Sequence, residues 1–203
     1  MLAFRRSRDL AVCDFETAEL DLLESLLGQL IELLLDQGTG LFGPGTRPLP
    51  ADTAGPGEDI LARLERELDP GSGQFELQPV VDPVLKRLYP DAYPADPAAS
   101  HDFQRFTQAA QRDDKVGCAQ RMLSDLRIAR ADLGHCTVPS AHTIAWLKSL
   151  TNMRLALAVR MGIETAEDAE ELAELPDDDP RSWVYSIYEW TGWVQESLLA
   201  VQD

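Results

Sequence analysis

The amino-acid sequence predicts a mainly α-helical protein, with residues 1–203 forming a single multi-helix domain of about six helices and a small N-terminal β-hairpin. Leucine-rich and aromatic segments repeat apolar residues at the three- and four-residue spacing of a helix face. The first fifteen residues instead alternate apolar and polar side chains, as strands do. A chain of 203 residues with 44% hydrophobic content is long enough for one well-buried domain.

The N-terminal segment 1–15 predicts the hairpin, with an irregular arm as the alternative, around a polar turn at 7–9. A helix is expected from about Glu16 to Gln37, ended by Gly38. Its leucines recur at the spacing of a core helix. A coiled-coil seam uses the same spacing, so a homodimer contact is the alternative.

The middle of the chain predicts irregular structure between short helices. Residues 38–57 are rich in glycine and proline and predict a flexible surface loop. Short helices are expected at 58–68 and within 82–97, and a long helical region begins near Ala98. The segment 134–139, which holds His135 and Cys136, is predicted to be a loop.

Ser140 is predicted to be the N-cap of a central helix that runs to about Gly162. Residues 164–179 carry nine carboxylates and predict a short exposed helix with an acidic loop. They lack the alternating spacing and the glycine of a calcium loop, so no metal site is predicted there. The last helix, Asp179 to Val201, holds three of the four tryptophans and is expected to be buried on most sides.

The formal net charge is −17, which argues against a large DNA-binding face because phosphates require a basic surface. The basic cluster Arg5, Arg6 and Arg8 is the candidate for a basic contact. The charge therefore favours protein partners, with DNA contacted only indirectly or weakly. No apolar run is long enough for export or for a membrane span, so we expect a cytoplasmic protein with no membrane contact.

Two arginines and two glutamates stand out because they lie within apolar helices. Arg154 and Arg160 fall in the central helix, and Glu189 and Glu196 fall in the last one. If these helices pack together, structural Arg–Glu pairs would offset the cost of burying the charges. The alternative is a polar pocket for a ligand or for the tail of a partner.

Three segments carry a resemblance to a known family. They are 85–93 (LKRLYPDAY), 146–162 with WL, NMRLAL and RMG, and 188–198 with YEW and GWVQESL. In this order and spacing the chain resembles an actinobacterial family of small acidic proteins, a domain of unknown function whose genes commonly lie beside that of the Clp protease adaptor ClpS. It is similar to the actinomycete oxidative stress regulator family, outside residues 38–57. The resemblance implies a redox-sensing transcription regulator that acts with an alternative sigma factor, and it brings no catalytic motif.

A cysteine sensor requires a thiolate and a second thiol within reach. The candidates are Cys13, Cys118 and Cys136, an odd number that indicates a reducing compartment. Cys136 is the favoured reactive thiol because it lies beside His135 and before a helix N-terminus, and both features lower a thiol pKa. Either other cysteine could be its partner, and the alternative is three ordinary buried thiols. Zinc ligands could be proposed at His135, Cys136 and His142 with Cys118, but these residues lack the paired spacing of a strong zinc site, so no metal is expected.

The sequence contains no GxSxG, Walker A or GxGxxG motif, which argues against the common enzyme classes. We therefore expect a non-enzymatic, cofactor-free regulator of transcription that responds to oxidation and binds a sigma factor or RNA polymerase. On this hypothesis, disulfide formation shifts the hairpin or the segment 134–139 and changes a protein-binding surface. The alternative, motivated by the gene neighbourhood of the family, is an adaptor or scaffold linked to Clp-dependent proteolysis.

Overall fold

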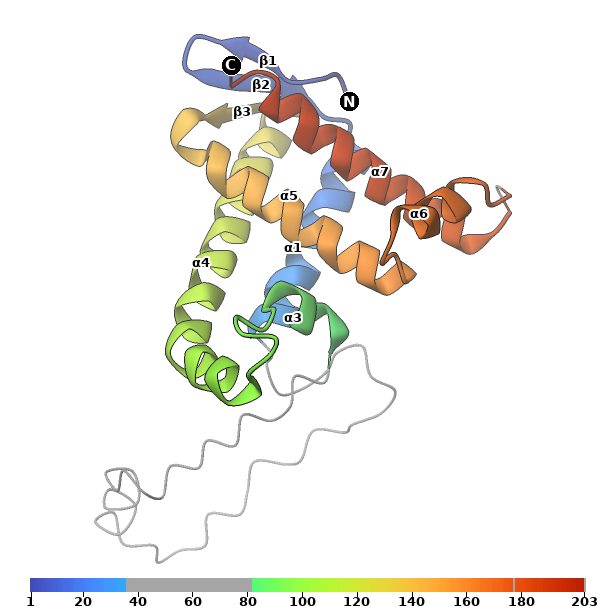
Figure 1. Cartoon of the computed structure of the whole chain (residues 1–203). Helices are drawn as coiled ribbons and strands as arrows, with labels where there is room; N and C mark the ends of the chain where they lie inside the picture. Colours follow the sequence, from blue (N-terminus) through green and yellow to red (C-terminus); the bar gives the residue numbers. More distant parts are fainter. Residues whose placement is uncertain (36–81, 177, 203) are drawn as a thin grey trace, which may run out of the picture.

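The computed structural model describes residues 1–35, 82–176 and 178–202, and this part of the chain is mainly helical, as predicted (Figure 1). The predicted loop at 38–57 and the predicted helix at 58–68 lie outside the described residues. In chain order the elements are β1 (Arg5–Ser7), β2 (Leu10–Asp14), α1 (Thr17–Leu35), α3 (Pro83–Leu88), α4 (Pro97–Ala131), β3 (His135–Pro139), α5 (Ser140–Met161), α6 (Ala166–Ala173) and α7 (Pro180–Leu199).

The three strands form one antiparallel sheet in the order β1-β2-β3. The N-terminal hairpin is therefore confirmed, but the prediction of a loop at 134–139 is wrong, because this segment is the edge strand β3. Along this strand His135 is exposed, Cys136 is buried, Thr137 is exposed and Val138 is buried. This is the alternation of a strand with one covered face. A run of five residues is too short for this alternation to be recognised in the sequence. The segment forms a strand because its backbone pairs with β2.

A tight turn leads from α4 into β3. Leu133 and Gly134 have positive φ angles of 54° and 94°, and the Gly134 carbonyl accepts a 2.9 Å hydrogen bond from the Phe15 amide. A Cβ on Gly134 would overlap the carbonyl oxygen of Phe15. The absence of a side chain at Gly134 therefore allows β3 to come alongside β2.

The core lies between α1, α4 and α5, with the sheet at one end of the helices and both chain termini close to it (Figure 1). Trp146 of α5 is fully buried and its ring contacts Phe4 edge-on, with 5.9 Å between ring centroids. The predicted apolar stripe of α1 packs into this core, so these leucines are buried by other parts of the same chain. Its buried residues are Leu20, Leu23, Leu27, Leu30 and Leu34.

The last helix, α7, packs along α5 on the outside of the molecule (Figure 1). The expectation that it is buried on most sides is wrong, because Trp183 and Trp193 are 66% and 40% exposed. The small residues Thr191 and Gly192 are buried in the contact with α5 instead. Ser140 also differs from the prediction, since it is the first residue of α5 and not its cap. Within the described residues, no helix combines the length and apolar character of a membrane span.

Candidate functional site

Cys13 and Cys136 are opposite each other in the paired strands β2 and β3. Both are free thiols and both are completely buried, and Cys136 is the group that affects the Cys13 thiol most strongly. Directly opposed residues of antiparallel strands have Cα atoms about 4.5–5.5 Å apart. This lies within the range of about 4.4–6.8 Å that a disulfide requires. The register of the sheet thus brings together two of the three cysteines considered as redox residues.

The environment of Cys13 opposes its ionisation. The hydrogen bond from Cys136 and the burial of the site raise the pKa of the Cys13 thiol far above its ordinary range, and the nearby carboxylates of Asp14 and Glu19 act in the same direction. Because the thiolate is the reactive form of cysteine, a raised pKa makes the folded Cys13 thiol less reactive. Reaction therefore requires β3 to separate from β2 or another opening that admits solvent.

His135 does not lie beside the Cys136 thiol, although the two residues are adjacent in sequence. Successive side chains of a strand point to opposite faces, so Cys136 faces the core and His135 faces solvent. The His135 Nδ1 atom lies 2.8 Å from Asp14 Oδ1, and Arg5 Nη2 donates to the other oxygen of Asp14 at 3.2 Å. The outer face of the sheet over the cysteine pair therefore carries a charged, exposed Arg5–Asp14–His135 group.

Cys118 is separate from this pair. It lies half-exposed on α4, where burial and the Asp114 carboxylate raise its pKa and Lys148 acts in the opposite direction. The groups that act on Cys13 are a different set, led by Cys136. The structure thus assigns Cys118 to the α4–α5 surface and not to the sheet.

The basic cluster Arg5, Arg6 and Arg8 lies on β1 and in the turn that follows it, and all three residues are exposed. Arg8 has a positive φ of 58° in that turn. The Arg5–Asp14 pair is exposed on both sides, and such a pair contributes little to stability, about 0–1 kcal/mol. The cluster is therefore available for a contact at the edge of the sheet.

The two arginines of α5 have partners other than the glutamates considered above. Arg154 Nη1 donates to Gln195 Oε1 at 3.3 Å, and its guanidinium carbon lies 4.9 Å from the centre of the Tyr188 ring. Arg160 Nη2 donates to Asp82 Oδ2 at 2.6 Å. The two glutamates of α7, Glu189 and Glu196, are exposed.

A polar group inside the core was not singled out by the sequence. Asp125 of α4 is 7% exposed, and its Oδ2 atom accepts a 2.8 Å hydrogen bond from Trp146 Nε1 and lies 2.9 Å from His142 Nδ1. The residues are far apart in sequence on two helices, so no local spacing could have revealed the group. In the described segments, no cluster of three or more histidine, cysteine, aspartate or glutamate side chains is arranged to hold a metal ion.

Comparison with known proteins gives two relationships. A protein of Mycobacterium leprae (strain TN) named as an oxidative stress regulator, AosR, is 30% identical over an alignment of 131 residues that covers 58% of this chain and 57% of that protein. The match thus spans a little over half of the length of that relative. No solved structure is significantly similar. Residues 1–202 match the family described as a domain of unknown function, DUF2017. Since this match covers almost the whole chain, the protein belongs to the DUF2017 family.

Proposed function

We propose that this protein is a non-enzymatic regulator of the oxidative stress response and that Cys13 and Cys136 are its redox-active pair. The observation that carries the proposal is the register of β2 and β3, which places the two cysteines directly opposite each other. The name of the M. leprae relative supports the link to oxidative stress. At rest in a reducing cytoplasm the pair is a dithiol.

The redox step that we propose uses hydrogen peroxide as the oxidant. One thiol loses its proton, and the thiolate attacks peroxide and becomes a sulfenic acid; the O–O bond breaks, and the leaving hydroxide takes up the released proton to give water. The second thiol then displaces a second water and forms the disulfide, so that the two cysteines lose two electrons and peroxide is reduced to water. The buried position and the raised pKa of Cys13 make this step depend on opening of the sheet. The protein therefore responds to sustained oxidation and not to small fluctuations.

On this proposal, oxidation links the N-terminal hairpin covalently to the strand that leads into α5. β3 continues directly into α5 at Ser140, and β2 belongs to the N-terminal hairpin. A disulfide covalently joins these segments and alters the surface that carries Arg5, Asp14 and His135. We propose that this surface binds an alternative sigma factor or RNA polymerase, and that binding differs between the dithiol and the disulfide form.

Disulfide mapping by mass spectrometry tests the redox pair. We expect mild peroxide to produce a Cys13–Cys136 link that a reductant reverses, in the native protein and in Cys118→Ser alike. Cys13→Ser should abolish the link. Three unmodified thiols, or a link that involves Cys118, would contradict the proposal.

A pull-down from reduced and oxidised protein tests the partner. We expect a sigma factor or polymerase subunit to be captured preferentially in one redox state, and this preference to be lost in Cys13→Ser. Capture of ClpS or Clp subunits in both states, without sigma factor or polymerase, would favour the adaptor in Clp-dependent proteolysis instead.

A further inference from the structure

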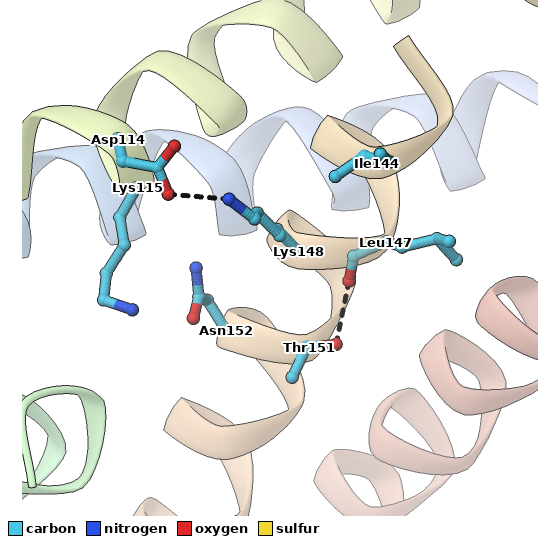
Figure 2. A pocket seen from close by; sticks show the side chains of 7 residues that line it. All are labelled: Asp114, Lys115, Ile144, Leu147, Lys148, Thr151 and Asn152. Atoms are coloured by element: carbon cyan, nitrogen blue, oxygen red, sulfur yellow. Dashed lines mark hydrogen bonds and ion pairs between the residues drawn. The ribbon is translucent and has the colours of Figure 1, made fainter. Parts of the chain in front are cut away.

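A hollow of about 300 Å³ lies between α4 and α5, away from the cysteine pair (Figure 2). The whole sequence contains three lysines and has a net charge of −17, yet two of the lysines, Lys115 and Lys148, line this hollow. The third, Lys86, lies exposed on α3. A strongly acidic protein thus concentrates its few ammonium groups around one surface depression.

The two lysines have different surroundings. Lys148 Nζ donates to Asp114 Oδ2 at 2.9 Å, which neutralises both charges (Figure 2). Lys115 Nζ lies 5.5 Å from the centre of the Tyr89 ring and, among the described residues, has no ion pair with a carboxylate. Burial lowers the pKa of Lys115. An anion bound beside Lys115 would stabilise its charged form, since a nearby negative charge favours an ammonium ion.

Asn152 supplies a polar group at the same hollow. The residue is 6% exposed, and within the described segments its side-chain amide has no hydrogen-bond partner. In Figure 2 the side chains of Lys115 and Asn152 both reach into the space between the helices. The Asn152 amide atoms are not among the enclosed polar atoms without a partner, so they are open to the solvent in the hollow, where a ligand can reach them. An amide NH₂ beside an ammonium group is suited to the two oxygens of a carboxylate.

The other side of the hollow is apolar. Ile144 and Leu147 of α5 line it, and Ile144 is 67% exposed. We propose that the hollow is a binding site for a small carboxylate with a short apolar tail. The carboxylate contacts Lys115 and Asn152, and the tail covers Ile144 and Leu147. Because the hollow is open on one side and the ligand is small, we expect an affinity in the roughly millimolar range.

Titration of ¹⁵N-labelled protein, followed by NMR, tests the site. The probe is sodium butyrate, and the controls are butyramide, which has the same tail without the charge, and sodium chloride at equal ionic strength. We expect butyrate to produce saturable shifts at the Asn152 side-chain amide and at the backbone amides near Lys115. Equal shifts with butyramide or with sodium chloride would overturn the proposal, and this comparison needs no variant.

Two lysine variants test whether the ammonium group of Lys115 binds the carboxylate of butyrate. Lys115→Met keeps an unbranched stem against Tyr89, and we expect it to weaken butyrate binding about tenfold through loss of a charge-assisted hydrogen bond. Lys86→Met removes the same charge elsewhere and should leave binding unchanged. Equal affinities for the two variants would exclude Lys115 as the anion contact.

Cys118 provides a second readout, because its thiol lies within the electrostatic influence of Lys115 and Lys148. We expect saturating butyrate to slow alkylation of Cys118 at least twofold, and butyramide to leave the rate unchanged. Alkylation that is insensitive to both compounds, together with flat NMR titrations, would show that only water fills the hollow. This result leaves the proposal for Cys13 and Cys136 unaffected.

Discussion

The indole nitrogen of Trp146 donates a 2.8 Å hydrogen bond to the buried carboxylate of Asp125, and this contact joins α5 to α4 in the core. Burial of a carboxylate without partners is costly, and here the indole and His142 Nδ1 at 2.9 Å provide them. The largest fully buried side chain of the described residues thus also provides a partner for Asp125, the one acidic residue that is buried among them.

Trp146→Phe removes the indole donor and keeps an aromatic ring. We expect the free energy of unfolding in urea to fall by about 2 kcal/mol, because hydrogen bonds to charged groups contribute about 1.5–3 kcal/mol. The matched control is Trp183→Phe on the exposed side of α7, where the change should stay within about 0.5 kcal/mol. Similar losses for the two variants would show that the Asp125 contact contributes nothing specific.

Gly192 provides the space for the guanidinium of Arg154. A Cβ at Gly192 would lie 3.1 Å from Arg154 Cζ, whereas a Cβ at Gly117 of α4 meets nothing within 4 Å. We expect Gly117→Ala to raise the free energy of unfolding by about 0.5–1 kcal/mol through helix propensity. Gly192→Ala should give less than this or destabilise, because Arg154 must move from Tyr188. In an Arg154→Met background the two alanines should have equal effects, and a persistent difference would argue against this explanation.

The raised pKa of Cys13 predicts a loss of stability in alkaline solution. The thiol ionises near pH 8.5–9 in the unfolded chain but stays protonated in the folded protein, so the unfolded state binds fewer protons above this pH. Stability should be unaffected by this group below about pH 8 and should fall above pH 9 by up to about 1.4 kcal/mol per pH unit. Urea unfolding of reduced protein between pH 7 and 10 measures this. Cys13→Ala should have a flatter profile, and parallel profiles would contradict the assignment.

The three thiols should differ strongly in their rates of alkylation. Cys118 is half-exposed, whereas Cys13 and Cys136 are fully buried and react only after local opening. We expect iodoacetamide to modify Cys118 first and the sheet pair slower by roughly a hundredfold or more, as opening costs several kcal/mol. Peptide mass spectrometry over time measures the three rates. In 6 M urea the rates should converge, and a fast reaction at Cys136 in the native protein would restore it as an independently reactive thiol.

The leucine spacing of α1 predicted its buried face because helix periodicity is a local property of the sequence. The same reasoning located the N-terminal hairpin and the segments that form α5, α6 and α7. The same reasoning placed His135 beside the Cys136 thiol because the two residues are adjacent in sequence. On a strand, adjacent side chains point to opposite faces, so the two side chains are apart. A strand of five residues becomes recognisable only when its hydrogen-bonding partner is known.

The sequence by itself determined the mainly helical class, the acidic surface, the three cysteines and the apolar stripes, all of which follow from composition and short-range period. Only the tertiary structure decided which cysteines meet, which partners Arg154 and Arg160 have, and that Lys115 and Asn152 share one hollow. These relationships join residues on different elements. They depend on strand register and on the packing of helix faces, which no short stretch of sequence encodes alone.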